Sequence, residues 1–218
     1  LNAQLKTRHG IDALNLGIPT FATARELEAA RLHAPKAEGV VLQYCENDFG
    51  ENAEYLSFPP EQEPEVRKGV LQNITEAKEV YTIRKATSQP WHDTLSAIAQ
   101  VVRQREYATR PELQARAAAR DYPQEALKFS GILARYKDYL RGRHVIVYES
   151  TSYGRNSPRF AKTFDAVLHK QLPDLDVEVL DVSQYVNQDD YFWLDDHPRA
   201  SFYAKVADML GPRLGAAH

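Results

Sequence analysis

Three short runs of apolar, largely β-branched residues recur along the chain, separated by longer amphipathic stretches. The runs are Gly39–Tyr44 (GVVLQY), His144–Tyr148 (HVIVY) and Val177–Val182 (VEVLDV). Strands of this kind are typical of a parallel sheet that is covered by helices on both faces. Strand–helix–strand connections, which are right-handed in almost all proteins, are the expected way to join them. The sequence therefore predicts an α/β fold with a parallel sheet.

The segments between these runs predict the remaining elements. A fourth strand is expected at Ile11–Leu16, because the turn signal Gly17-Ile18-Pro19 follows it. The acidic, proline-rich residues 50–70 are expected to form a loop. Thr23 is expected to cap a helix, with Glu26 at capping-box spacing. The stretches expected to be helical are Thr23 to about His33, residues 91–107, residues 123–141, Ser157–Leu172 and Pro198–Leu210.

Composition excludes several classes of protein. The 218 residues are 43% hydrophobic and show no internal repeat, which favours a single domain over residues 1–218. The net charge of −3 gives no electrostatic reason to expect nucleic-acid binding. No stretch approaches the roughly 18 apolar residues of a membrane span. The one cysteine, Cys45, excludes an internal disulfide, and no Cys/His spacing or glycine-rich phosphate loop indicates a metal or a cofactor. The compartment stays open, with an exported or periplasmic location favoured.

Polar residues follow each predicted strand, and in an open parallel sheet this is where active sites lie. Gly17-Ile18-Pro19-Thr20 follows the predicted strand Ile11–Leu16, and Glu46-Asn47-Asp48 follows Gly39–Tyr44. Glu149-Ser150-Thr151-Ser152 follows His144–Tyr148, and the chain after Val177–Val182 leads to Asp195 and His197. We expect these four segments to meet at one edge of the sheet.

The ordered motifs resemble those of SGNH hydrolases, also called GDSL-type lipases and esterases. The motifs are Asn15 to Thr20 (NLGIPT), Glu26-Leu27, Val40–Tyr44 leading to Asn47-Asp48, and Asp195-Asp196-His197-Pro198. The resemblance extends over nearly the whole chain from Ile11 onward. It implies a flavodoxin-like, three-layer α/β/α fold and the hydrolysis or transfer of acyl groups, often acetyl groups on carbohydrates. The expected substrate is therefore a small-molecule or carbohydrate ester.

The resemblance also implies a role for each site residue. Asn47 would donate its side-chain amide to the oxyanion, and the backbone N–H at Thr20 would be a second donor. His197 would be the general base and Asp195 would orient its ring, with Asp196 as the alternative for that role.

The nucleophile of the family, a serine in a Gly-Asp-Ser block on the first and central strand, does not occur in this sequence. We expect it upstream of Leu1, so that the chain is a mature, truncated or cleaved product. A partner segment would then carry the serine. Without that strand, we expect the isolated 218 residues not to fold alone.

Several residues depart from the family pattern. Thr20 and Cys45 stand where the family often has glycine, and Leu194 stands where it often has the aspartate. The departures at Thr20 and Cys45 slightly favour an alternative function, a catalytically inactive relative that binds carbohydrate or a partner protein. An unrelated flavodoxin-like ligand-binding or signalling domain is a further alternative.

Each motif also has a purely structural interpretation. Asn47-Asp48 is compatible with a simple turn, and Asp195-Asp196 with a helix N-cap followed by Pro198. Cys45 is an alternative nucleophile, although a cysteine at a buried strand end more often packs as a small apolar residue. Ser150, Thr151 and Ser152 lack the flanking glycines of a nucleophile elbow and are expected to be loop hydroxyls. The aromatic stretch Tyr185 to Trp193 would form a cleft wall, a lid or part of the core.

Overall fold

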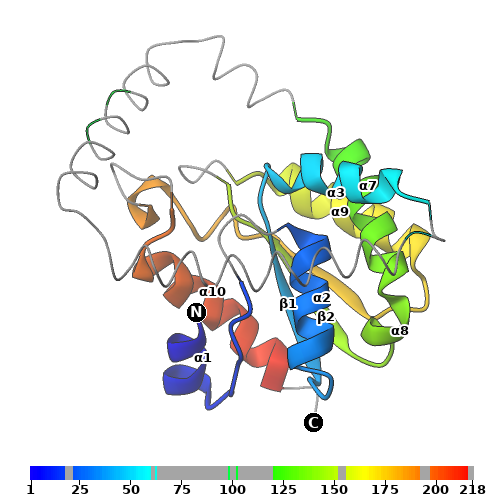
Figure 1. The fold of residues 1–218 in the computed structure, drawn as a ribbon. Helices are drawn as coiled ribbons and strands as arrows, with labels where there is room; N and C mark the ends of the chain where they lie inside the picture. Colours follow the sequence, from blue (N-terminus) through cyan, green and yellow to red (C-terminus); the bar gives the residue numbers. More distant parts are fainter. Residues whose placement is uncertain are drawn as a thin grey trace.

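A three-stranded parallel sheet forms the centre of the molecule (Figure 1). The computed structural model describes residues 1–17, 22–59, 62, 98, 102, 120–151, 156–191 and 197–215. The strands are β1 (Gly39–Tyr44), β2 (His144–Glu149) and β3 (Val177–Leu180), in the spatial order β1-β2-β3. Both neighbouring pairs are parallel, with Gly39 opposite His144 and Val145 opposite Val177. The predicted α/β fold with a parallel sheet is confirmed.

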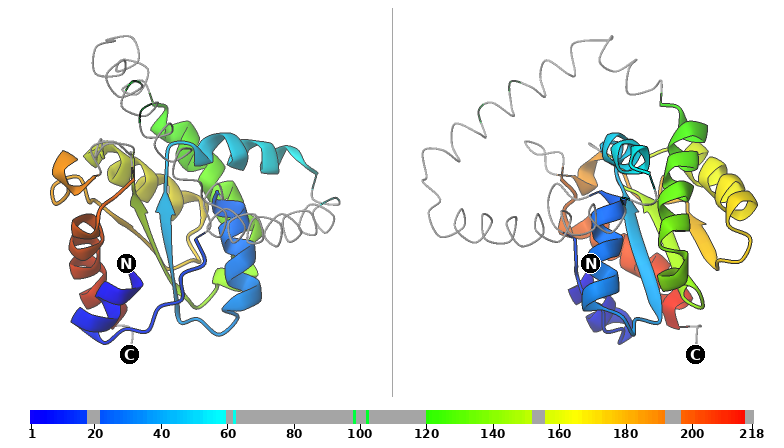
Figure 2. Two further views of the ribbon diagram at one scale, coloured as in Figure 1. Left: turned by 60° about the vertical axis from the view of Figure 1, so that its left-hand side comes forward. Right: turned by 45° about the vertical axis from the view of Figure 1, so that its right-hand side comes forward.

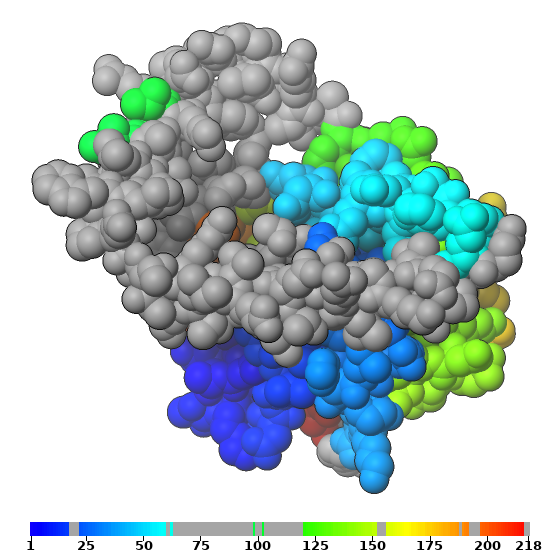
Figure 3. All heavy atoms as spheres, in the orientation of Figure 1, coloured from blue at the N-terminus to red at the C-terminus, as the bar shows by residue number. Residues whose placement is uncertain are grey.

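Helices cover both faces of the sheet, as the two views of Figure 2 show. One face carries the four helices α2 (Thr23–His33), α3 (Asp48–Ser57), α7 (Tyr122–Arg135) and α9 (Pro158–Gln171), with the short α8 (Lys137–Leu140) directly after α7. The other face carries α1 (Asn2–His9) and α10 (Ala200–Gly215), with the 3-10 helix η3 (Gln188–Asp190) before α10. Side chains of α1, α2 and α3 reach the face of the molecule seen in Figure 3. No helix in the described part of the chain is long and apolar enough to cross a bilayer.

Alternate residues of β2 enter two separate hydrophobic cores. Val145 and Val147 join the core under α2, α3, α7 and α9, whereas Ile146 and Tyr148 join the core under α1 and α10. All four side chains are at most 1% exposed. The first core, here called the aromatic core, contains Tyr44, Phe129, Phe160 and Phe164, with the Phe160 and Phe164 ring centroids 4.0 Å apart. The second is called the α1–α10 core.

Local sequence signals explain where two of the helices begin. Asp121 precedes α7, and its side chain accepts a hydrogen bond from the Gln124 N–H at 3.1 Å. Ser157 precedes α9 and accepts from the Arg159 N–H at 3.2 Å, with Pro158 as the first helical residue. The predicted helices at 123–141 and Ser157–Leu172 are therefore confirmed, the first of them divided into α7 and α8. The predicted helix at 91–107 falls almost entirely outside the described residues.

The strand expected at Ile11–Leu16 does not form. Only its two end residues are partly buried, and Leu14 is 64% exposed. Asn15 accepts a hydrogen bond from the Gly17 N–H at 3.0 Å, which makes a local turn. The segment pairs with none of the described strands. Because its apolar residues do not line one face, the segment has no alternating pattern to bury against a core.

Two further predictions are wrong around α3. Part of the loop expected at residues 50–70 is helical, since α3 extends to Ser57, and two carboxylates in its first turn suit the positive end of the helix dipole. The expected cap of α2 is also displaced. Ala22 occupies the N-cap position, and Thr23 is the first helical residue, 1% exposed. Its hydroxyl accepts a hydrogen bond from Asn52 of α3 at 3.2 Å, so packing between the helices replaces capping.

Candidate functional site

The ends of β1 and β2 lie side by side at one edge of the sheet, here called the carboxyl edge. Tyr44 and Glu149, the last residues of the two strands, are opposite one another in the parallel register. The Ser150 N–H donates a hydrogen bond to the Tyr44 carbonyl at 2.8 Å. The polar residues that follow each strand therefore start from the same place, as the sequence predicted for these two segments.

Residues Cys45 to Asp48 form a turn between β1 and α3, here called the Asn47 turn. The Asp48 N–H donates to the Cys45 carbonyl at 3.1 Å. In return, the Cys45 N–H donates to Asp48 Oδ2, also at 3.1 Å. The Asp48 side chain is buried, at 5% exposure. Asp48 thus performs the structural work expected of an aspartate in a turn.

The Asn47 side chain makes none of the hydrogen bonds that hold this turn. It occupies the N-cap position of α3, where an asparagine normally accepts a hydrogen bond from the helix. Its backbone is in the right-handed helical region (φ −76°, ψ −17°) and its side chain makes no capping hydrogen bond. The residue is exposed, and its amide has no hydrogen-bond partner in the described part of the chain. The amide of Asn47 is therefore available to a ligand at the carboxyl edge.

His197 is exposed and lies shortly before α10, on a segment that is held at both ends. Tyr191 forms an antiparallel bridge with Pro198, and the Arg199 N–H donates to the Asp190 carbonyl at 2.7 Å. Asp190 is only 3% exposed, and Lys205 of α10 donates to its carboxylate at 2.6 Å. These contacts fix where the chain passes into α10.

Tyr191 connects the His197 segment to the end of β2. Its hydroxyl accepts a hydrogen bond from Asn156 Nδ2 at 3.3 Å, and Asn156 Oδ1 accepts from the Thr151 N–H at 2.9 Å. Burial raises the pKa of Tyr191 to about 12, while hydrogen bonds from Asn156 and Ser150 act in the opposite direction.

The structure thus positions two of the four predicted site residues, Asn47 and His197, on segments that belong to the carboxyl edge. Thr20 and Asp195 lie outside the described residues, as does the alternative Asp196. In the aromatic stretch, Tyr191 is buried in the α1–α10 core and Tyr185 is 56% exposed.

Of the three hydroxyl residues after β2, Ser150 and Thr151 lie in the described part of the chain and Ser152 lies outside it. Ser150 and Thr151 are each 4% exposed, and Thr151 Oγ1 donates to Asn156 Oδ1 at 3.1 Å. This agrees with their interpretation as loop hydroxyls. Cys45 is a poor alternative nucleophile, because burial and the nearby charge of Asp48 raise the pKa of its thiol well above the usual range.

A buried ion triad that no sequence motif indicates lies beside this edge. Arg120 binds Glu125 at 2.5 Å and Glu149 at 2.5 Å, with the three side chains 12%, 7% and 2% exposed. Glu149 also accepts from the Ser157 N–H at 2.8 Å, which ties the start of α9 to the end of β2. Burial raises the pKa of Glu149 to about 7, although Arg120 and the Ser157 N–H favour its charged form. The one sequence signal for this triad is Glu149, an acidic residue at the end of an otherwise apolar strand.

Glu26 and Asp48 are further titratable groups near the Asn47 turn. Burial raises the pKa of Glu26 to about 8, and the charges of Asp48 and Glu51 add to this effect. Burial likewise raises the pKa of Asp48 to about 7, opposed by its hydrogen bond from Cys45. Carboxyl groups that titrate near neutral pH are common at functional sites.

Among the described residues, no group of three His, Cys, Asp or Glu side chains has the arrangement of a metal site. Comparisons with protein-family models, curated proteins and solved structures return no match for this chain. The basis for assigning a function is thus the chemistry of the carboxyl edge.

Proposed function

We propose that the protein is a serine esterase or acyltransferase of the SGNH type, acting on a short acyl ester such as an acetyl group on a carbohydrate or small molecule. The observation that carries this proposal is the state of Asn47. Its amide is exposed at the end of a parallel strand and takes part in neither the helix cap nor the turn, because Asp48 holds the turn. An amide in this situation suits an oxyanion donor.

In the proposed reaction, Asn47 donates its N–H₂ group to the oxyanion of the tetrahedral intermediate. A second donor, by resemblance to the family, is the backbone N–H at Thr20. A preorganised donor of this kind contributes about 10²–10³-fold to the rate of related acyl transfers. The position of Asn47 at the first turn of α3 adds the positive end of a helix dipole near the same oxygen.

His197 is the proposed general base and general acid. It takes the proton from the attacking serine hydroxyl and returns it to the leaving alcohol. Asp195 orients the imidazole and stabilises its charged form, with Asp196 as the alternative. The bridge between Tyr191 and Pro198 supports this role, since a general base must be held within hydrogen-bond reach of its nucleophile.

The nucleophile in this proposal is a serine on a segment that precedes Leu1. Among the described strands, β1 pairs only with β2, and in this proposal one more parallel strand pairs with the other edge of β1. That strand would be the central one of a flavodoxin-like sheet, and its carboxyl end would bring the serine beside Asn47. Attack on the ester gives an acyl-enzyme, which water or an acceptor hydroxyl then resolves.

A binding function is the second candidate. Cys45, which is partly exposed at the carboxyl edge, stands where the family often has glycine, and this favours a domain that binds carbohydrate or a partner protein without catalysis. Asn47 and His197 together favour catalysis, because a binding site does not need a general base. Reaction with a serine-directed probe separates the two.

The test is intact mass spectrometry of the full product of the gene after treatment with a fluorophosphonate. We expect a single adduct, its loss in His197→Ala, and about 100-fold slower labelling in Asn47→Ala. His33→Ala is the matched control, since His33 is an exposed histidine at the end of α2. A folded protein that takes up no probe, or a His197→Ala variant that labels like the wild type, would exclude the esterase.

A further inference from the structure

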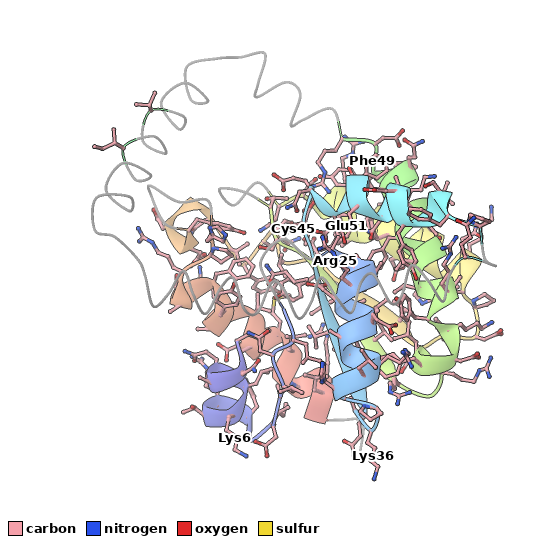
Figure 4. The ribbon with its side chains drawn as sticks, in the orientation of Figure 1. Lys6, Arg25, Lys36, Cys45, Phe49 and Glu51 are labelled. Atoms are coloured by element: carbon pink, nitrogen blue, oxygen red, sulfur yellow. The ribbon has the colours of Figure 1, made fainter. Side chains whose placement is uncertain are left out.

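Glu149 is the last residue of β2 and lies at the carboxyl edge, opposite Tyr44 in the parallel register. Figure 4 shows Cys45, the residue that follows β1, at this same edge. The Glu149 side chain is 2% exposed, and both of its carboxylate oxygens accept hydrogen bonds. Oε1 accepts from Arg120 Nη1 at 2.5 Å, and Oε2 accepts from the Ser157 N–H at 2.8 Å. Glu149 therefore joins the residue before α7 to the start of α9.

Both donors to Glu149 are also held by a second contact. Arg120 Nε donates to Glu125 Oε1 at 3.0 Å, so its guanidinium is fixed between two buried carboxylates. The Ser157 hydroxyl caps the first turn of α9. Because Ser157 binds Glu149 through its N–H and the helix through its hydroxyl, the peptide group between Asn156 and Ser157 is held against β2.

Asn156, the residue before Ser157, connects the end of β2 to the buried Tyr191. Its Oδ1 accepts from the Thr151 N–H at 2.9 Å and from the Thr151 hydroxyl at 3.1 Å. Its Nδ2 donates to the Tyr191 hydroxyl at 3.3 Å. One short side-chain amide makes all three contacts, so Asn156 keeps them together only while its own backbone stays in place.

Tyr191 carries the connection on to His197. It is 2% exposed and belongs to the α1–α10 core. It also forms the antiparallel bridge with Pro198, the residue that follows His197. A continuous series of contacts therefore leads from the Glu149 carboxylate to the residue beside His197.

The two donors around Glu149 match a carboxylate and not an amide. An ionised carboxylate offers two acceptor oxygens, whereas a glutamine amide of the same shape offers one acceptor and one donor group. A glutamine here would accept from either Arg120 or the Ser157 N–H, and would present its NH₂ group to the other. Hydrogen bonds to a charged group are also shorter and stronger than neutral ones. The hold of β2 on the start of α9 therefore depends on the carboxylate.

We propose that Glu149 is a positioning residue for His197. Its carboxylate fixes the peptide group before Ser157, and through the Asn156 side chain it fixes the buried Tyr191. Without the carboxylate, the start of α9 loosens from β2 and the His197 segment loses one of its attachments. A catalytic group displaced by about 1 Å can cost on the order of 10²-fold in rate. The effect on catalysis rests on the proposed esterase function, whereas the effect on the segment does not.

Amide hydrogen exchange tests this connection without any assumption about catalysis. We would measure the exchange of two N–H groups by NMR at pH 8, where the Glu149 carboxyl is charged. The Thr151 N–H reports on the Asn156 contact, and the Arg199 N–H, which donates to a backbone carbonyl at 2.7 Å, reports on the base of the His197 segment. An N–H within the sheet, that of Val145, is the reference for general opening, since it donates to a backbone carbonyl at 2.9 Å.

Glu149→Gln and Glu149→Met remove the carboxylate, and Glu125→Gln is the matched control. Glu125 is also buried and pairs with the same Arg120 guanidinium, but its side chain accepts its other hydrogen bond from the Tyr44 hydroxyl. All three variants remove one negative charge from the triad and leave Arg120 with one carboxylate. Relative to the Val145 N–H, we expect several-fold faster exchange of both reporter N–H groups in the Glu149 variants and wild-type rates in Glu125→Gln.

Wild-type exchange of the Arg199 N–H in both Glu149 variants would overturn the proposal. Equal acceleration in Glu125→Gln would also overturn it, because the effect would then come from the lost charge and not from the hydrogen bond with Ser157. Asn156→Ala guards against Glu149 variants that do not fold, since it leaves the ion triad whole and breaks the same connection. We expect it to accelerate exchange of the Arg199 N–H, and an unchanged rate would contradict the proposal.

Fluorophosphonate labelling extends the test to catalysis by comparing a double variant with its two single variants. Glu149→Gln and Tyr191→Phe break the same series of contacts at two points. We therefore expect each to label several-fold more slowly, and the double variant to label no more slowly than the slower single variant. Effects that multiply in the double variant would be independent, and the positioning role would fail.

The labelling and exchange results separate the two proposals. If the wild type takes up no probe, the proposed esterase function fails and the exchange rates still decide whether Glu149 holds the segment. If Glu149→Gln labels like the wild type, the positioning of His197 fails and the esterase stands.

Discussion

The Tyr191 hydroxyl accepts a hydrogen bond from Asn156 Nδ2 at 3.3 Å, across 35 residues of sequence. Tyr191 belongs to the segment that leads to His197, whereas Asn156 is held by Thr151 at the end of β2. The contact therefore joins two parts of the candidate site that come from different strand ends. Tyr191 is buried and Asn156 is half-buried, so this hydrogen bond is partly shielded from water.

Replacing Tyr191 by phenylalanine removes the hydroxyl that hydrogen-bonds with Asn156 and Ser150. The ring keeps its edge-on packing against Phe202, with centroids 5.5 Å apart, while the Asn156 amide loses its acceptor. We expect a loss of about 1–2 kcal/mol in the free energy of unfolding, measured with urea, and slower fluorophosphonate labelling. Tyr185→Phe is the control, because Tyr185 is 56% exposed. Equal stability of the two variants would show that the hydrogen bonds of the Tyr191 hydroxyl contribute nothing.

Asn47 and Asp48 divide their tasks, and stability measurements at pH 6 should show it. Asn47→Ala removes no intramolecular hydrogen bond, so we expect a change within about 0.5 kcal/mol. Asp48→Ala removes the acceptor of the Cys45 N–H and should cost about 1–2 kcal/mol. A large loss in Asn47→Ala would mean that its amide supports the fold, and would weaken its assignment as an oxyanion donor.

Arg120 is expected to be essential for stability. Arg120→Met leaves Glu125 and Glu149 buried without their cation, which should cost about 3–5 kcal/mol at pH 8. Arg141→Met is the matched control, since Arg141 and its partner Asp138 are 63% and 97% exposed. Adding Glu149→Gln to Arg120→Met should restore part of the loss, because it removes one of the two uncompensated charges. No recovery in the double variant would contradict this account.

The raised pKa values predict how stability depends on pH. Glu26 titrates at about 8 in the folded protein instead of its ordinary 4.5, and Asp48 and Glu149 at about 7. At a pH between the ordinary pKa of a carboxyl group and its raised pKa in the folded protein, the folded state binds more protons than the unfolded state. The free energy of unfolding therefore falls as the pH rises from about 5 to 8.

Urea titrations at pH 5, 6.5 and 8 measure this dependence. We expect the free energy of unfolding to fall by several kcal/mol over this range, and a shallower slope in Glu26→Gln, whose side chain does not titrate. The exposed Glu54→Gln should keep the wild-type slope. Stability that is constant or rises over this range would show that these carboxyl groups ionise freely in the folded protein.

The elements that the sequence predicted correctly are those in which local pattern and burial coincide. All three strands of the sheet are runs of apolar residues, and α9 has both a Ser157 cap and a proline in its first turn. Ile11–Leu16 contains similar residue types, yet only its ends are partly buried. Whether such a segment pairs depends on a neighbouring strand, which its own residues do not specify.

The same distinction applies to the site. Asn47 and His197 stand out because each belongs to a short local motif next to a strand end or a helix start. Arg120 and Glu149 meet across 29 residues, and no spacing rule indicates such a pair. Glu26 was overlooked as a titrating group because its burial depends on α3, a helix that the acidic, proline-rich sequence concealed.

The alternation of side chains on β2 has a consequence for the precision of assembly. A slip of one residue in its pairing would exchange Val145 and Val147 with Ile146 and Tyr148, and each set would face the wrong layer of helices. The aromatic core would then receive a tyrosine sized for the opposite side. The register of this one six-residue strand therefore decides which side chains face each of the two helical layers that it separates.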